Sequence, residues 1–258
     1  MTSIHPTAIV HPGAKLGAGV SIGAYSLIGE HVEIGDNTTV AAHVVITGRT
    51  KIGRDNRIFQ FCSVGDEPQD KKYAGEPTVL EIGDRNTIRE SCTLNCGTVQ
   101  DGGVTRVGND NWIMAYVHVA HDCQVGSNVI FANCTQLAGH VQVGDWAILA
   151  GFTGVHQFVR IGAHSMTSVS SVLLQDMPPY VMASGSPAQP RSINAEGLKR
   201  RGFSSAAITA IRRAFKTLYR QGHSLDEARA LIAAEVTQTP ELAILAEFIA
   251  EPGRGIIR

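Results

Sequence analysis

Five of the ten histidines fall between His118 and His164, and His121 is followed directly by Asp122. A histidine beside a carboxylate is the minimum set for general-base catalysis, because imidazole titrates near about pH 6.5 and a carboxylate can fix its tautomer and stabilise the imidazolium that forms. Any single histidine is more often an ordinary surface residue. The prediction of a catalytic base therefore depends on whether the fold gathers these histidines.

A six-residue period describes the elements that would position them. Starting at Ile4, an aliphatic residue recurs at every sixth position through Val64, and the register returns at Ile82 and again from Val107 to Ile161. A strand alternates every two residues and a helix repeats every 3.6, so this period indicates one inward side chain per short strand, followed by a turn. Small or β-branched residues lie four positions after most of these aliphatic residues, as tight corners require. The pattern predicts a solenoid.

The period resembles that of the hexapeptide-repeat family, whose members wind three flat faces of about 18 residues per coil into a left-handed prism. The left-handed sense comes from the resemblance alone, because crossovers between parallel strands are normally right-handed. The implied fold is mainly β: a left-handed parallel β-helix of hexapeptide repeats with a C-terminal α-helical domain. One coil would separate His121 from Gly139, and we expect five histidines on one face. On or beside that face would lie His118, His121, Asp122, Gly139, His140 and His156.

Two interruptions of the period, at residues 66–80 and 97–105, predict loops extruded from the solenoid. Long loops on a rigid scaffold often carry function. Val64 and Ile82 are 18 residues apart, which we interpret as one full coil, so the first loop would leave and re-enter the prism in phase.

After Pro187 the repeats end and helical signals begin. Ser224 and Glu227 match a capping box before an amphipathic run, and the preceding run ends at Gly222. We expect residues 1–193 to form the β-helix domain and residues 194–258 a helical domain that covers its open end, where strand edges would otherwise be unpaired. The second segment has ten Lys and Arg against seven Asp and Glu, which would suit an acidic partner.

The composition argues against several classes of protein. No apolar run approaches about 18 residues, and residues 1–20 lack the basic start and apolar stretch of a signal peptide, so we expect a cytoplasmic protein with no integral membrane segment. The five cysteines are scattered and odd in number, so a disulfide framework is not expected. The net charge is −1, and we expect no nucleic acid partner.

Four longer motifs resemble one family of hexapeptide-repeat enzymes. They are His-Val-Ala-His-Asp-Cys at 118–123, Leu-Ala-Gly-His at 137–140, Gly-Val-His-Gln-Phe at 154–158 and Asn-Ala-Glu-Gly-Leu-Lys-Arg-Arg-Gly at 194–202. They resemble the UDP-N-acetylglucosamine O-acyltransferases, which open lipid A biosynthesis in Gram-negative bacteria. The resemblance extends over essentially the whole chain, and the last motif is the most specific.

The resemblance implies transfer of an (R)-3-hydroxyacyl group from acyl carrier protein to the 3-hydroxyl of UDP-N-acetylglucosamine, in a homotrimer with sites between subunits. It implies no metal or other cofactor, since the carrier's phosphopantetheine holds the acyl group. His121 would be the general base, Asp122 would orient it and balance its charge, and the Gly139 N–H would stabilise the oxyanion.

Other residues would bind the substrates by the same resemblance. The cleft would be lined by Gln69, Asp70, Lys72, His118, His140, His156 and Gln157. Asn194, Glu196 and Arg201 would hold the nucleotide, and Arg200 would favour the phosphopantetheine or the carrier. For residues 199–201 the alternative is a solvated helix face.

Two departures from the family pattern bear on the substrate. Where the family commonly shows Ile-His-Arg-Gly-Thr, residues 94–98 read Leu-Asn-Cys-Gly-Thr, so a histidine and an arginine are lost at the edge of the cleft. A glycine near the floor of the family's acyl groove corresponds to Val169, and we expect this larger residue to shorten the preferred acyl chain.

Two other functions stay open. A related N-acyltransferase or coenzyme A-dependent acetyltransferase would use a different acceptor or donor, and the motif at 194–202 argues against it. A non-catalytic or metal-binding β-helix is the other, because the γ-class carbonic anhydrases bind zinc through histidines at a subunit interface. The cysteines do not support a metal site, since Cys62, Cys92 and Cys123 occupy small corner positions of their hexads.

Overall fold

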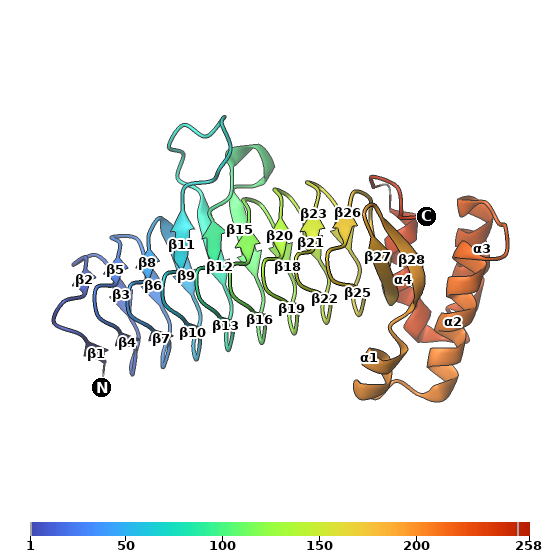
Figure 1. The fold of residues 1–258 in the computed structure, drawn as a ribbon, viewed down its shortest axis with the longest axis horizontal. Coiled ribbons are helices and arrows are strands. Elements are labelled where there is room, and N and C mark those ends of the chain that lie inside the picture. Colours follow the sequence, from blue (N-terminus) through green and yellow to red (C-terminus); the bar gives the residue numbers. More distant parts are fainter. Residues whose placement is uncertain (1, 252) are drawn as a thin grey trace.

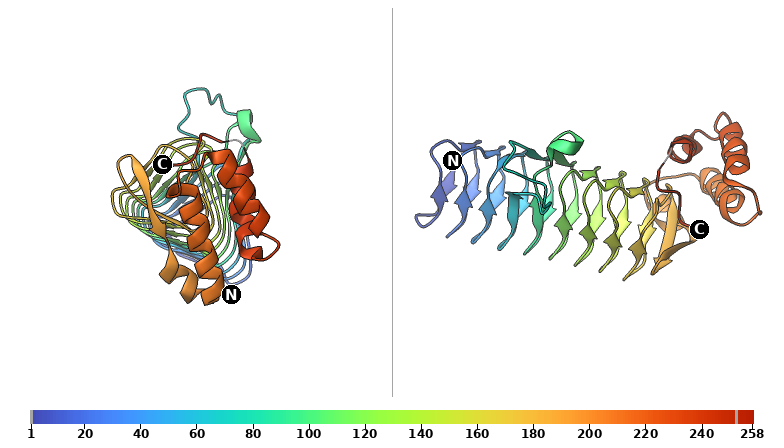
Figure 2. Two further views of the ribbon diagram at one scale, coloured as in Figure 1. Left: turned by 90° about the vertical axis from the view of Figure 1, so that its right-hand side faces the viewer. Right: turned by 90° about the horizontal axis from the view of Figure 1, so that it is seen from above.

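The computed structural model describes residues 2–251 and 253–258, with residue 101 described by its backbone only. The chain winds as a left-handed parallel β-helix with helices gathered at its C-terminal end (Figure 1). Viewed along the axis, the coils superimpose as a three-sided prism (Figure 2). The predicted fold class is confirmed.

Three sheets form the sides of the prism. Sheet A contains β1 (Ser3–Ile4), β4 (Ser21–Ile22), β7 (Thr39–Val40), β10 (Arg57–Ile58), β13 (Thr87–Ile88), β16 (Trp112–Ile113), β19 (Ile130–Phe131), β22 (Ile148–Leu149), β25 (Met166–Thr167), β27 (Val181–Gly185) and β28 (Ala188–Ile193). Sheet B contains β2 (Ile9–Val10), β5 (Leu27–Ile28), β8 (Val45–Ile46), β11 (Ser63–Asp66), β14 (Thr93–Asn95), β17 (His118–Val119), β20 (Gln136–Leu137), β23 (Gly154–Val155) and β26 (Val172–Leu173). Sheet C contains β3 (Lys15–Leu16), β6 (Glu33–Ile34), β9 (Arg49–Ile52), β12 (Val79–Ile82), β15 (Val104–Val107), β18 (Gln124–Val125), β21 (Gln142–Val143) and β24 (Arg160–Ile161).

From β1 to β27 each strand pairs in parallel with the strand one coil away, so equivalent residues stack. Val119 pairs with Leu137, and Leu137 pairs with Val155. The second residue of a typical strand points inward and is buried, as at Ile46 and Leu137. A regular stack of aliphatic side chains thus replaces the aromatic packing that the composition lacks.

The two extruded loops leave the prism at one corner. Val64 lies in sheet B and Ile82 in sheet C, so the interpretation of this interval as one full coil was wrong: it is one step between neighbouring sheets plus an insertion. A period of six cannot identify which of three faces follows an interruption. The first loop (residues 67–78) and the second loop (residues 96–103) both connect sheet B to sheet C, and both project from the same side of the prism (Figure 1).

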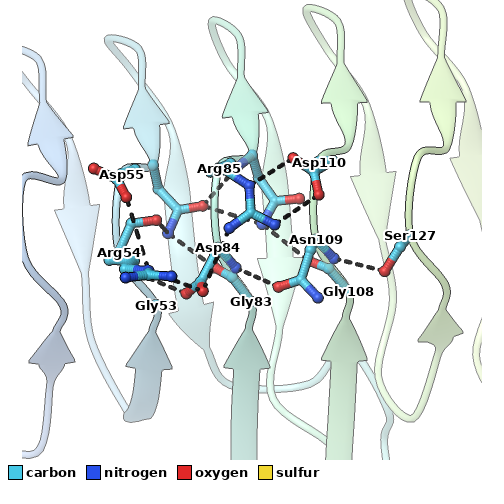
Figure 3. A network of polar contacts seen from close by, with 12 residues as sticks. Gly53, Arg54, Asp55, Gly83, Asp84, Arg85, Gly108, Asn109, Asp110 and Ser127 are labelled. Carbon is cyan, nitrogen blue, oxygen red and sulfur yellow. Dashed lines mark hydrogen bonds and ion pairs between the residues drawn. The ribbon is translucent and has the colours of Figure 1, made fainter.

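Polar ladders hold the coils together at the corner between sheets C and A (Figure 3). The inward positions of this corner hold asparagines where we expected small residues. The backbone N–H of Asn86 donates to Asn56 Oδ1, and the backbone N–H of Asn111 donates to Asn86 Oδ1, both at 2.9 Å. On the outer side, Arg85 forms two hydrogen bonds to Asp110, at 2.7 and 2.8 Å. Buried asparagines are tolerated here because each one satisfies the backbone of the next coil.

The C-terminal end combines a hairpin with four α-helices. The antiparallel hairpin β27–β28 extends sheet A beyond β25, so it covers that edge before the helices begin. The helices are α1 (Ala195–Arg200), α2 (Ser205–Tyr219), α3 (Leu225–Glu235) and α4 (Ala243–Ala250), and a short 3-10 turn at Pro240–Leu242 precedes α4. A second 3-10 turn, Val99–Asp101, lies in the second loop. The predicted capping box of Ser224 and Glu227 begins α3. The boundary between residues 193 and 194 stays a prediction, and among the described residues no helix has both the length and the apolar character to cross a membrane.

Candidate active site

A cleft of about 750 Å³ lies at the corner between sheets B and C, where both loops emerge. It is lined by Gln69, Asp70, Lys71, Lys72, Thr98, Gln100, His121, His140, Gln157 and Phe158. Six of the predicted site residues therefore surround one space. Both loops contribute to it, as expected for functional loops.

His121 and Asp122 form a hydrogen-bonded pair in this cleft. His121 Nδ1 lies 2.9 Å from Asp122 Oδ2, and the Asp122 side chain is completely buried. An ionised carboxylate can only accept, so Nδ1 carries the hydrogen and Nε2 keeps the lone pair. This is the tautomer that a general base needs.

Further hydrogen bonds stabilise the Asp122 carboxylate. The Thr98 backbone amide donates to Oδ1 at 2.8 Å, and the Thr98 hydroxyl donates to Oδ2 at 2.6 Å. The main chain is held as well, because the backbone amide of Asp122 donates to Thr105 Oγ1 at 2.8 Å. Burial by itself would raise the pKa of Asp122, but the hydrogen bonds from His121 and Thr98 together outweigh it, and the pKa lies below its usual value. The carboxylate is thus held in its charged form.

Gly139 contacts the ring of His121 from the next coil. A Cβ atom at this glycine would lie 2.4 Å from His121 Cε1 and 2.7 Å from Nε2, far inside van der Waals contact, so the ring position requires glycine. Among the described residues the Gly139 amide N–H has no hydrogen-bond partner, while its carbonyl accepts from Phe158. A buried, unpaired N–H beside the base can stabilise an oxyanion.

His140 and Phe158 continue the column of corner residues that begins at Asp122. All three have φ between 61° and 65°, and the His140 and Phe158 rings stack with centroids 4.3 Å apart. His140 Nε2 lies 3.8 Å from Asp122 Oδ2. Donor atoms of His121, Asp122 and His140 lie within 4.8 Å of one another, so this trio is also the place where a metal ion could bind.

Two other predicted histidines flank the cleft along sheet B. The His118 Nδ1 lies 2.7 Å from Thr93 Oγ1. Burial and the neighbouring His121 lower the pKa of His118, which favours its neutral form. His156 is exposed, and its Nδ1 lies 3.1 Å from the Gln157 carbonyl oxygen.

The expectation of five histidines on one face was wrong for His164. It lies at the corner between sheets C and A, stacked between Trp146 and Tyr180 with centroids 6.4 and 5.7 Å away. Burial and the charge of Arg201 lower its pKa to about 4. His164 is therefore a neutral packing residue, and position within the 18-residue coil would have assigned it correctly.

The predicted nucleotide residues are not part of this cleft. Asn194 is buried, accepts from the Gly197 amide as the cap of α1 and donates to the His164 carbonyl. Arg201 donates to the Trp146 carbonyl at 3.1 Å. Glu196 and Arg200 are exposed on α1. This group, residues 194–201, thus lies by the corner between sheets C and A, away from the corner that holds His121.

Val169 lies at the third corner, between sheets A and B, and is 66% exposed. It does not line the cleft within its own chain. Its role in acyl-chain selection stays a prediction.

Asn95 and Cys96, which stand where the family commonly has a histidine and an arginine, are buried. Asn95 Nδ2 donates to the Glu67 carbonyl at 2.7 Å, and Cys96 Sγ lies 3.3 Å from the Gly65 carbonyl oxygen. Burial raises the pKa of the Cys96 thiol to about 11, so it is no nucleophile at neutral pH. The Asn95 contact joins the first loop to sheet B, whereas the Cys96 contact joins the start of the second loop to β11.

Thr98, Thr93 and Phe158 contact the predicted site residues but were not themselves predicted to belong to the site. Phe158 could have been found, because it lies 18 residues after His140. Thr98 could not, since it reaches Asp122 from an insertion whose length breaks the register.

Comparison with known proteins identifies the family. Residues 176–257 match the model described as UDP N-acetylglucosamine O-acyltransferase, domain 2, and residues 13–48 and 105–139 match that of the bacterial transferase hexapeptide (six repeats). A protein of Verminephrobacter eiseniae named acyl-[acyl-carrier-protein]--UDP-N-acetylglucosamine O-acyltransferase is 55% identical, with 100% of each chain covered. The chain belongs to the UDP-N-acetylglucosamine O-acyltransferase family.

Two further comparisons agree with this assignment. A family member of the same name from Thiobacillus denitrificans is 64% identical over 203 residues, which cover 79% of each chain. The solved structure of LpxA from Acinetobacter baumannii matches with a TM-score of 0.97 at 46% identity, covering 99% of each chain. The family predicted from the motifs is confirmed, and the protein is an acyltransferase.

Proposed function

We propose that this acyltransferase moves an (R)-3-hydroxyacyl group from acyl carrier protein to the 3-hydroxyl of UDP-N-acetylglucosamine, the first step of lipid A biosynthesis. The names of its relatives support the donor and the acceptor. The observation that carries the mechanism is the pairing of His121 Nδ1 with the buried Asp122, while Gly139 packs against the Cε1 and Nε2 side of the imidazole.

The proton and electron movements follow from this arrangement. His121 Nε2 takes the proton of the sugar hydroxyl while its oxygen attacks the thioester carbonyl. The tetrahedral oxyanion accepts a hydrogen bond from Gly139 N–H. When the intermediate collapses, the C–S bond breaks, the carrier sulfur takes the proton back from His121, and the ester forms. Asp122 stabilises the imidazolium between the two proton transfers.

The remaining site residues have supporting roles in this proposal. Asp70 and Lys72 from the first loop, with Gln69, would orient the sugar, and His118, His140, His156 and Gln157 would complete the cleft. Asn194, Glu196 and Arg201 would hold the nucleotide and Arg200 the carrier. Because these four lie at another corner of the prism, we propose a homotrimer in which a second subunit supplies them. No metal or other cofactor takes part.

The test is acyl transfer by wild type and His121→Ala, each assayed with 3-hydroxyacyl carrier protein and UDP-N-acetylglucosamine. Loss of a general base lowers kcat by about a hundredfold or more, and the variant's thermal unfolding and oligomeric state should match wild type. Dialysis against EDTA should leave wild-type kcat unchanged within about twofold. Near-normal activity of the variant would place the base elsewhere, whereas loss of activity on chelation would favour a metal at His121, Asp122 and His140.

A further inference from the structure

We infer that Thr98 is a positioning residue for the proposed reaction: it clamps the Asp122 carboxylate and thereby fixes the tautomer and ring orientation of His121. The inference rests on the proposed function. It starts from the observation that one residue of the second loop donates two hydrogen bonds to one carboxylate.

The two donors of Thr98 hold both oxygens of Asp122. Its amide N–H lies 2.8 Å from Oδ1, and its hydroxyl lies 2.6 Å from Oδ2. Thr98 is 1% exposed and the Asp122 side chain is fully buried, so water does not compete for these bonds. With both oxygens engaged the carboxylate cannot rotate, and Oδ2 stays aimed at His121 Nδ1.

The local backbone is shaped for this contact. A Cβ atom at Gly97 would lie 2.7 Å from Asp122 Oδ1 and 2.4 Å from the Val104 amide nitrogen. Only glycine lets the loop pass this close to the carboxylate. The second loop is therefore joined directly to the catalytic pair, so the position of the loop and the alignment of His121 depend on one another.

The chemistry explains why this matters to turnover. If Asp122 tilts, the neutral imidazole can place its hydrogen on Nε2, and that tautomer cannot accept the proton of the sugar hydroxyl. Thr98 also faces the cleft, but its hydroxyl proton is committed to Asp122. Loss of the hydroxyl should therefore lower kcat while the substrates still bind.

Three variants test this in the full-length enzyme. Thr98→Val removes only the hydroxyl donor, Thr98→Ser keeps it, and Thr135→Val is the matched control, because Thr135 is equally buried but donates to the Ala132 carbonyl away from the catalytic pair. We expect Thr98→Val to lose roughly tenfold or more in kcat, as for removal of a hydrogen bond to a charged group, with KM changed less than about twofold. Thr98→Ser should recover most of this loss, and Thr135→Val should resemble wild type.

A second readout does not need turnover. In ¹⁵N-histidine NMR, with the His121 signals assigned from their absence in His121→Gln, wild type should show Nδ1 protonated and Nε2 unprotonated. Thr98→Val should show a mixture of tautomers. Unchanged His121 signals in Thr98→Val would overturn the inference, as would a kcat loss that Thr98→Ser shares in full. An inactive wild type would refute the proposed function instead, and the NMR comparison would still decide the role of Thr98.

Discussion

Gly139 sets the position of the base by leaving room for it. The His121 ring occupies the space that any Cβ at this position would fill, and the nearest distance would be 2.4 Å. Among the described residues the Gly139 N–H has no hydrogen-bond partner, and this N–H is the donor proposed for the oxyanion. Gly139 thus has both a steric and an electrostatic role. Adding one methyl group at this position should impair both roles while the protein still folds.

We expect Gly139→Ala to lower kcat by about a hundredfold or more, because the imidazole must move out of line with the attacking hydroxyl. Steady-state kinetics beside a thermal melt would show it. Gly151→Ala is the control, since a Cβ there would meet only the Asn133 carbonyl oxygen, at 3.4 Å. Equal activity of the two variants would argue against the proposed contact.

At Val169 we expect substitution to change donor choice. Val169→Gly should shift the preference toward longer acyl chains, because the larger side chain would shorten the groove, whereas wild type should favour shorter ones. Competition between 3-hydroxyacyl carrier proteins of different length would measure the ratio of kcat/KM values. If both enzymes prefer the longest donor equally, Val169 does not set chain length.

At the scale of elements, one corner of the prism holds the candidate catalytic residues and another holds side chains that pack the coils together. The corner between sheets B and C carries both loops and the catalytic pair. The corner between sheets C and A carries the asparagine ladder and the aromatic column of Trp146, His164 and Tyr180. This column supports α1 through Asn194 and Arg201, so its integrity should matter for the proposed nucleotide site.

His164 should make the stability of this column depend on pH. Its pKa is about 4 in the folded protein against about 6.5 in an unfolded chain. Between these values the unfolded state binds more protons, so the free energy of unfolding falls as the pH drops from about 6.5 to 4. His164→Phe keeps a ring without a titrating group, and its urea midpoint should fall less than that of wild type between pH 7 and pH 5.

Arg201 and Asp145 are the charged groups whose fields act on His164, and both remain in that variant. Carboxylates that titrate elsewhere contribute equally to the two proteins. An identical pH dependence in wild type and His164→Phe would show that His164 protonates as easily in the folded state as in the unfolded chain.

At the scale of the whole molecule, the residues predicted to act on the acceptor sugar and its nucleotide form two groups on different corners. One group lines the cleft and includes residues 69–72, His121, His140 and Gln157, while residues 194–201 form α1 and its two caps. Stacked coils fix each corner rigidly, so no bending of one chain brings the groups together. Rotation about a threefold axis parallel to the β-helix would place one corner of each subunit beside a different corner of its neighbour.

Subunit mixing tests this arrangement. We expect His121→Ala and Arg201→Ala each to be strongly impaired alone, yet their co-expression should restore about a quarter of wild-type activity, because one site in four in randomly mixed trimers receives both intact residues. Co-expression of His121→Ala with Gly139→Ala is the control. In our proposal one subunit supplies both residues to a given site, so no mixed trimer contains an intact site. Recovery in neither pair would mean that the site is built within one chain.

The sequence by itself determined the solenoid, and its resemblance to the hexapeptide-repeat family implied the three-face coil and with it most of one active-site corner. An aliphatic residue at every sixth position leaves few other folds, and adding 18 residues places Gly139 against His121 and His140 next to Asp122. The motifs identified the family for the same reason, since residues fixed by register keep their spacing.

Only the tertiary structure decided what the interruptions do. An inserted loop resets the count of faces, so sequence spacing could not show that both loops share the catalytic corner, that Thr98 reaches Asp122, or that Asn95 contacts the first loop. His164 needed no such information, because its position within the 18-residue coil already separates it from the other histidines. The periodic part of the chain obeys local rules, whereas the position of a loop depends on contacts with coils distant in sequence.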